Sequence, residues 1–432
     1  MHKQQPIARS MKVIVTSLCL LALFILMNVE RSASFKAEGS SSSQANSCFD
    51  CHSNSGRLLS LAQPPEEEGG GCGAAPDRPY FLNFFVSRTF LSSVHGRLSC
   101  TSCHGGNAAT GAATAADMRA AHQGMIEPTA SCRACHAATV ASHQTSLHKT
   151  LAGQDQALLL RAGQQNFDRL HAMRTMDCNK CHAGCGDCHV SIPQGVGGGL
   201  IQGHTFFKKP PMKETCAACH GTRAGAEYLG TVKEGLPADV HFTKGMDCLA
   251  CHKEAFHGDG IQYQSRWQVQ GLPKCTDCHR ALPDATSRVM AHLIPKHQTV
   301  SCQVCHAVAY NNCFTCHSFV DAQGKYRRIP QQKLVLFKIG RNTVPGYPYT
   351  YVPVRHNPIA RNTFDYFGQN LLPFFDDYPN WKTAAPHNIQ RVTPQNRTCG
   401  ACHGNRSLFL TREDLDAADP RANEQVVVDR IP

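Results

Sequence analysis

The sequence predicts a mainly irregular and α-helical fold with little β-sheet, and three observations support this prediction. The chain of 432 residues contains 34 glycines and 24 prolines, which interrupt helices and strands. Alternating apolar and polar patterns, typical of half-buried strands, are scarce. Two segments show helical periodicity, residues 112–125 and 156–173, so a helix is expected in each.

The cysteines of the chain follow one repeated pattern. Of the 24 cysteines, all but Cys19 and Cys72 fall into eleven copies of Cys-x-x-Cys-His. The paired cysteines are Cys48 and Cys51, Cys100 and Cys103, Cys132 and Cys135, Cys178 and Cys181, Cys185 and Cys188, Cys216 and Cys219, Cys248 and Cys251, Cys275 and Cys278, Cys302 and Cys305, Cys313 and Cys316, and Cys399 and Cys402. The histidines that end these motifs are His52, His104, His136, His182, His189, His220, His252, His279, His306, His317 and His403.

This spacing fits covalent haem attachment. Two thiols separated by two residues can each add to one vinyl group of the same porphyrin, and the next residue then offers its imidazole to the iron as proximal ligand. Disulfide frameworks and zinc ribbons do not need a histidine after every second cysteine. The sequence therefore predicts eleven covalently attached haem c groups, with the motif cysteines binding the porphyrin and the motif histidines binding iron.

The density of these motifs refines the expected fold. Residues 48–403 offer only about 32 residues per haem, which leaves little chain for a conventional apolar core. We therefore expect short helices and loops wrapped around a closely packed chain of haems. Two motif pairs, within residues 178–189 and 302–317, are so close in sequence that their porphyrins must be neighbours.

The second axial position of each iron decides between a carrier and an enzyme. A second histidine gives a six-coordinate haem that only exchanges electrons, whereas an open position can bind substrate. Outside the motifs and the N-terminal region, the candidate distal ligands are His95, His122, His143, His148, His171, His204, His241, His257, His292, His297, His356 and His387. These twelve histidines suffice to cap eleven haems, and methionine is the alternative ligand. Which histidine serves which haem does not follow from the sequence.

The N-terminus predicts export. Basic residues precede an apolar run from Val13 to Met27, and Ser32-Ala33-Ser34 provides a small-x-small cleavage site. Residues 1–34 are thus expected to be a signal peptide, with an uncleaved N-terminal anchor, and hence membrane association, as the alternative. Either way, the protein is expected to be periplasmic or extracellular.

Composition suggests three sections after residue 34. Residues 35–199 hold the first five motifs and end in the glycine-rich 195–199, and residues 200–320 hold the next five. Residues 321–432 hold the eleventh motif and an aromatic-rich interval without cysteine. A packed lobe is the favoured interpretation of these aromatic residues, and a docking surface is the alternative.

The basic charge of the chain does not indicate nucleic-acid binding. The formal net charge is +11, and residues 1–34 contribute four Lys or Arg and one Glu. Each ferric haem would add about one negative charge through its two propionates, so the holoprotein is expected to be slightly acidic. The lysines and arginines are therefore interpreted as partners of propionates.

The motif array and the histidines upstream of several motifs, such as His95 before Cys100 and His241 before Cys248, resemble those of multihaem cytochromes of metal-reducing and other anaerobically respiring bacteria. The resemblance implies an electron-transfer conduit in anaerobic or extracellular respiration. Its implied partners are other redox proteins: a membrane quinol oxidoreductase, carrier cytochromes or an outer-membrane conduit. Two alternatives stay open, namely an oxidoreductase acting on a small nitrogen or sulfur species at a haem without distal histidine, and a subunit whose haems serve self-assembly.

Overall fold

The computed structural model describes residues 46–62, 78–108, 114–127, 129–174, 183–193, 196–231, 235–253, 256–280, 289–308, 313–320, 326–333, 337–357 and 359–432. By its contacts the chain divides into two compact units, Met1–Asn46 and Ser47–Pro432. The predicted signal peptide or anchor lies outside the described residues, as do Cys19 and Cys72. The three predicted sections stay predictions.

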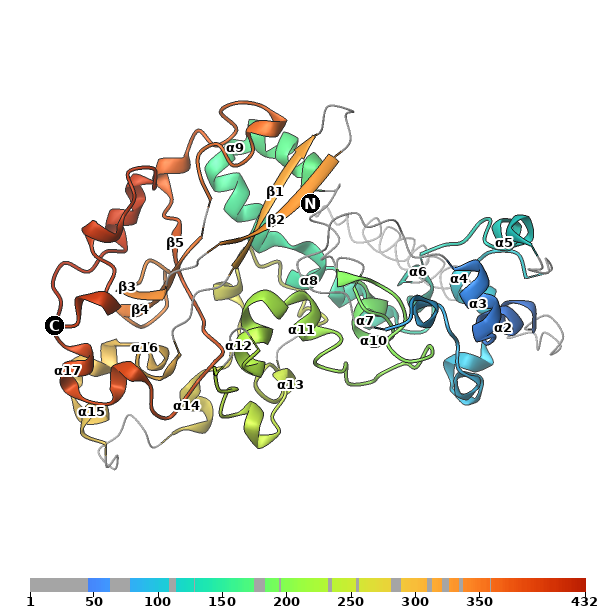
Figure 1. Ribbon diagram of the computed structural model, residues 1–432, viewed down its shortest axis with the longest axis horizontal. Coiled ribbons are helices and arrows are strands. Elements are labelled where there is room, and N and C mark those ends of the chain that lie inside the picture. The colour runs from blue at the N-terminus through green and yellow to red at the C-terminus, as the bar shows by residue number, and fades with distance from the viewer. Residues whose placement is uncertain are drawn as a thin grey trace, which may run out of the picture. The chain divides into compact units, whose positions relative to one another are not determined.

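Short helices and loops make up most of the described chain, as predicted (Figure 1). The α-helices are α2 Asn46–His52, α3 Ser55–Leu61, α4 Cys100–His104, α5 Ala115–Ala121, α6 Thr129–Cys132, α7 Ala137–His143, α8 Leu147–Thr150, α9 Ala152–Arg174, α10 Cys185–His189, α11 Cys216–Cys219, α12 Ala226–Leu229, α13 Cys248–Cys251, α14 Cys275–Cys278, α15 Met290–Leu293, α16 Cys302–His306 and α17 Cys399–Cys402. The strands are β1 Cys313–Val320, β2 Tyr326–Lys333, β3 Phe337–Arg341, β4 Tyr351–His356 and β5 Trp381–Thr383. Among the described residues, no helix is both long and apolar enough to cross a membrane.

Most described motifs form a single helical turn that begins at or just before the first cysteine. In such a turn, residues three apart lie on the same face, so both thiols of one motif point to the same side. The turns are capped locally: the side chains of Ser99, Asp247 and Thr398 accept hydrogen bonds from backbone N–H groups of α4, α13 and α17. These caps fix where each cysteine pair begins.

The tenth motif differs from the others. Its backbone, Cys313–His317, is part of strand β1, which pairs with β2 in an antiparallel two-stranded sheet. An extended backbone turns successive residues to opposite faces, unlike the helical turn of most other described motifs. The side chains of β1 and β2 lie outside what the structure describes.

Both helices expected from periodicity are present, with different bounds. The first is confined to Ala115–Ala121, and the second extends over Ala152–Arg174. Within α9 the backbone at Gly163 has φ 68°, where the helix kinks. A side chain at this position would meet the ring of Phe374. Glycine is therefore required for the close approach of this ring.

The C-terminal part has a conventional apolar core that includes a β-sheet. The sequence did not predict this sheet. Strands β3, β4 and β5 form a three-stranded antiparallel sheet with β4 in the centre. Val352, Val354 and Trp381 are buried in one cluster with Leu410 and Val426. Two further clusters complete the core: Ala162, Leu170, Leu371, Leu372 and Phe375 in one, and Val304, Ile339, Phe409 and Val428 in the other.

Several aromatic residues of this part pack into its core, as a packed lobe would require. Phe375 and Trp381 are almost fully buried, and Tyr347 and Tyr349 pack against the sheet cluster. Gly199, at the end of the glycine-rich segment, has φ 87°, and a side chain at this position would meet Asn83. The predicted linker stays a prediction.

Candidate metal centres

Nine motif histidines each face a histidine from outside the motifs, counted over the described residues. The pairs, with the distance between ring centroids, are His52–His122 (6.0 Å), His104–His204 (5.8 Å), His136–His95 (6.2 Å), His189–His257 (5.9 Å), His220–His148 (6.2 Å), His252–His387 (6.3 Å), His279–His241 (6.1 Å), His306–His292 (6.1 Å) and His403–His297 (5.8 Å). Every partner belongs to the predicted set of distal ligands. The sequence identified the motif histidines and the candidate distal histidines as two sets. The structure shows which members of the two sets lie opposite each other.

The narrow range of these distances is informative. Rings in van der Waals contact can meet at many separations and angles. Two imidazoles on opposite sides of one metal ion, with metal–nitrogen bonds of about 2 Å, have ring centroids about 6 Å apart. The nine pairs therefore have the spacing of axial ligands that share an ion between them.

Hydrogen bonds orient many of these imidazoles. Nδ1 donates to a backbone carbonyl oxygen in His52, His122, His189, His297, His306 and His387, over 2.6–3.1 Å. A bond from Nδ1 fixes the tautomer and leaves Nε2 free to bind a metal. Six of the eighteen paired histidines therefore have the kind of hydrogen bond that orients a metal-binding imidazole.

Burial keeps several of the paired histidines neutral. Desolvation, followed by the nearby His220, lowers the pKa of His148 to about 4. Desolvation, followed by the nearby His104, likewise lowers the pKa of His204 to about 4. Neutral imidazole is the form that binds a metal, so these ligands are ready at neutral pH.

Two buried carboxylates support distal histidines, and the sequence analysis missed both. Asp239 is 1% exposed, and its Oδ1 accepts hydrogen bonds from the backbone N–H of His241, at 2.7 Å, and from the Nδ1 of His241, at 3.0 Å. Glu227 is fully buried and accepts from the backbone N–H of His387 while pairing with Arg355. The Asp-x-His spacing at 239–241 is a signal that could have revealed the first of them.

Three predicted distal ligands lie elsewhere. His143, at the end of α7, is buried beside His257 with ring centroids 6.5 Å apart. His171, near the end of α9, lies 5.5 Å from the ring of Phe167. The Nε2 of His356 is 3.0 Å from Oδ1 of Asp419, and its ring lies 5.2 Å from that of Trp381.

Two motifs have no described side chains. The fourth motif, Cys178, Cys181 and His182, lies outside the described residues. For the tenth, Cys313, Cys316 and His317, the structure gives only the backbone of β1. The haem sites predicted for these two motifs stay predictions.

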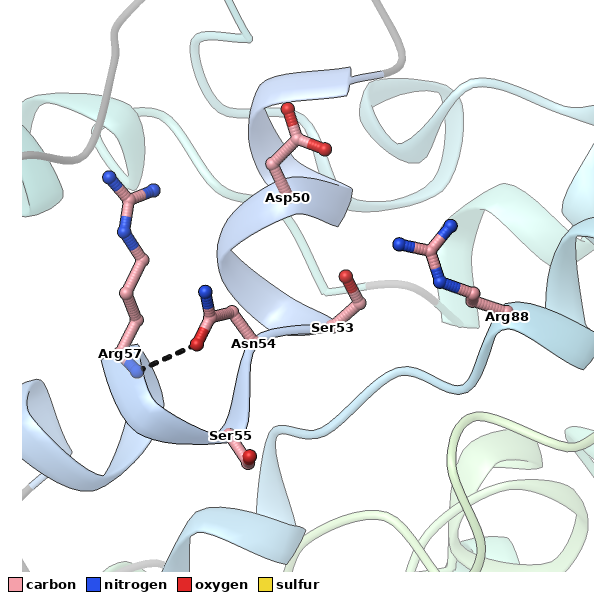
Figure 2. A pocket seen from close by; sticks show the side chains of 6 residues that line it. All are labelled: Asp50, Ser53, Asn54, Ser55, Arg57 and Arg88. Carbon is pink, nitrogen blue, oxygen red and sulfur yellow. Dashed lines mark hydrogen bonds between the residues drawn. The ribbon is translucent and has the colours of Figure 1, made fainter.

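A polar pocket of about 470 Å³ adjoins the first motif (Figure 2). It is lined by Asp50, Ser53, Asn54, Ser55, Arg57 and Arg88. The two guanidinium groups lie on either side of the end of α2 in Figure 2. Arginines so placed can hold carboxylate groups, which agrees with the sequence-based interpretation of basic residues as partners of propionates.

Among the described residues, no group of three or more histidine, cysteine or acidic side chains is arranged so that it could hold a metal ion. No protein-family model, no curated protein and no solved structure matches this chain. Its function has therefore to be argued from its own residues.

Proposed function

We propose that this chain is an eleven-haem c-type cytochrome that carries electrons between other redox proteins and has no substrate chemistry of its own. The observation that carries the proposal is the set of nine histidine pairs at 5.8–6.3 Å, each joining a Cys-x-x-Cys-His motif to a distant histidine. When bound, haem supplies the one-electron chemistry. The chain holds each haem by two thioethers and two imidazoles.

Apolar side chains beside the paired histidines support haem over a bare metal ion. Val94, next to His95, is 78% exposed, and Met290, two residues before His292, is 72% exposed. Leu91 and Leu98 lie near Val94 in the sequence, Val289 and Leu293 lie near Met290, and all four are also exposed. Single exposed apolar side chains are ordinary, whereas groups of them mark surfaces that bind something apolar. A flat porphyrin between two imidazoles would cover them.

The count of distal ligands supports a carrier over an enzyme. Nine of the twelve candidates are paired, and His356 is held by Asp419. His143 and His171 then remain for the fourth and tenth motifs. Just after the fourth motif, the chain contacts α8: the N–H of Ala183 donates to the carbonyl of His148. His148 is close to His143 in the sequence.

For the tenth motif, the element contacts favour His171. Strand β1 contacts the 3₁₀ turn Asp365–Phe367, and Phe367 packs in the same cluster as Leu170 of α9. The end of α9 therefore lies near the tenth motif. We propose that His143 completes the fourth site and His171 the tenth, so that no haem is left open for substrate.

Low-temperature EPR of the purified, fully oxidised protein tests the proposal, with the haem content checked by intact mass. We expect eleven haems, all low-spin, and a spectrum that cyanide and nitrite do not change. A high-spin signal of about one haem in eleven that responds to these ligands would replace the carrier by an enzyme. A mass without haem would end the cytochrome proposal altogether.

Replacing Asp239 with asparagine is expected to raise the reduction potential of one haem. The Asp239 carboxylate withdraws the Nδ1 proton of His241 and enriches the ligand in electrons, which favours ferric iron. An amide is a weaker acceptor, so we expect a rise on the order of 60 mV, about a tenfold change in a one-electron equilibrium. Spectroelectrochemical titration measures the shift.

The matched control is Asp247→Asn. Asp247 also precedes a motif, but its Oδ1 caps α13 at Ala250 and its other oxygen pairs with Lys209, so it supports no imidazole. The control is expected to leave the potential of the eighth site, which His241 serves, within error of the wild type. Equal shifts in both variants would contradict the role of Asp239.

A further inference from the structure

The thiols of different motifs meet in four places. The thiols lie side by side in four pairs: Cys48 and Cys100, Cys132 and Cys185, Cys216 and Cys248, and Cys275 and Cys302. Other contacts join the same segments: the N–H of Ile126, near His122, donates to the carbonyl of His104 over 2.9 Å, and α6 contacts α10. In the proposed holoprotein these sulfurs are thioethers, so what persists is their contact. Because each sulfur is bonded to the porphyrin edge, touching sulfurs bring two porphyrin edges together. The first and second, third and fifth, sixth and seventh, and eighth and ninth sites are therefore neighbours.

The second and third sites are joined by contacts of another kind. The hydroxyl of Ser131, beside Cys132, donates to the carbonyl of Cys103 over 3.0 Å. The ring of Phe206 stacks on His95 at 3.9 Å and lies 5.5 Å from His204. Since His95 serves the third site and His204 the second, one aromatic ring touches the axial ligands of both.

The fifth, sixth and seventh sites follow each other in the same manner. Ala183, two residues before the fifth motif, donates its N–H to the carbonyl of His148, the distal partner of the sixth motif. Phe256 lies 5.8 Å from His148 and 6.4 Å from His252. It therefore joins the axial ligands of the sixth and seventh sites, whose thiols also meet.

Asp239 joins the seventh and eighth sites. Its Oδ1 holds His241, the distal partner of the eighth motif. Its Oδ2 accepts from the N–H of Ile389 at 2.6 Å, two residues after His387, the distal partner of the seventh motif. One buried carboxylate thus fixes the distance between two neighbouring axial ligands.

The ninth and eleventh sites share a core. Cys305 of the ninth motif and Cys402 of the eleventh both pack against the cluster around Val304 and Phe409. His297, just before the ninth motif, is the distal partner of His403 in the eleventh. Site nine therefore leads directly to site eleven, although the tenth motif stands between them in the sequence.

We propose that the nine described sites form a single file in the order first, second, third, fifth, sixth, seventh, eighth, ninth, eleventh. Electrons pass along this file, entering at one end site and leaving at the other. Contacts between sulfurs alternate along the file with contacts between axial ligands. This order deepens the proposed electron-transfer function and rests on it.

The order is tested by timing electron arrival from one end. A ruthenium photosensitiser is attached at Ser407→Cys, an exposed position four residues after His403, in a chain whose Cys19 and Cys72 are replaced by serine. Two matched variants mark single sites by a methionine ligand: His292→Met at the ninth site and His95→Met at the third. We expect the methionine-ligated haem at the ninth site to be reduced first. Reduction of the methionine-ligated haem at the third site should take several times longer. Simultaneous arrival, or earlier arrival at the third site, would overturn the order.

Iron positions provide a second test that needs no variant. Anomalous scattering from crystals of the holoprotein, or a cryo-electron microscopy map, locates every iron. The order is contradicted if another iron stands between two sites that are neighbours in the file. An open haem with the irons in this order would refute the carrier function and leave the file intact, so the two failures are distinguishable.

Discussion

Replacing His204 with glycine is expected to convert one proposed haem in eleven from low-spin to high-spin. His204 faces His104 at 5.8 Å and packs against Phe90 at 4.4 Å. Its backbone has φ 69°, which few residues other than glycine adopt readily. A histidine at such a strained position indicates that its side chain is needed there. Without this imidazole, only His104 would hold the haem of the second site, and an iron with one protein ligand would be high-spin. Glycine accepts the backbone angle, so the variant tests the ligand and not the fold.

EPR of the oxidised variant measures this change, and added imidazole should restore the low-spin signal by filling the space. The matched control is His356→Ala, which removes an imidazole bound to Asp419 and paired with no motif histidine of the described chain. We expect the control to stay fully low-spin. A fully low-spin His204→Gly protein without added ligand, or a high-spin signal in the control, would refute the assignment of distal ligands.

Replacing Glu227 with alanine is expected to lower the free energy of unfolding by about 3–5 kcal/mol, the usual effect of removing one partner of a buried ion pair. The carboxylate is fully buried, pairs with Arg355, and accepts from the N–H of His387. Its backbone carbonyl also accepts from the Nδ2 of Asn388 at 3.0 Å. The loss therefore leaves a buried guanidinium without this charge and loosens the segment that carries a distal ligand.

Denaturation by guanidinium, followed by both far-UV circular dichroism and haem absorption, tests this expectation. Glu413→Ala is the control, because Glu413 forms an ion pair with Arg406 but is 81% exposed. Exposed pairs contribute little to stability, so the control should unfold like the wild type. If Glu227→Ala also unfolds at the wild-type midpoint, the buried pair does not stabilise the junction between residues 227 and 387.

The sequence identified two sets of histidines, those of the motifs and those outside them, but it did not indicate which members of the two sets lie opposite each other. Spacing alone identifies a proximal ligand such as His104, because the chemistry of attachment is local. Its partner His204 belongs to a different segment, and no local rule relates the two. The pairing depends on tertiary contacts, which only coordinates supply. The count of twelve candidates was informative, but it did not reveal that His356 is bound to Asp419.

The fold was predicted in class and missed in detail for physical reasons. The mainly helical and irregular character is confirmed, and the helix at Ala152–Arg174 lies where periodicity placed it. Strand β4 was missed because four successive residues, Val352 to Arg355, are buried, so alternation between two faces is absent. Nothing in the tenth motif itself distinguishes its extended backbone from the helical turns of the other motifs.

The pairing of His252 with His387 has a consequence for biosynthesis. A polypeptide emerges from the ribosome with its N-terminus first, so the seventh motif exists long before its distal ligand. The seventh site lies in the middle of the proposed file, between the sixth and the eighth. A product truncated just before His387 would therefore contain the seventh motif without its distal histidine, and it would also lack the eleventh motif. In the proposed cytochrome, the path through the seventh site thus depends on a segment that is synthesised more than a hundred residues later.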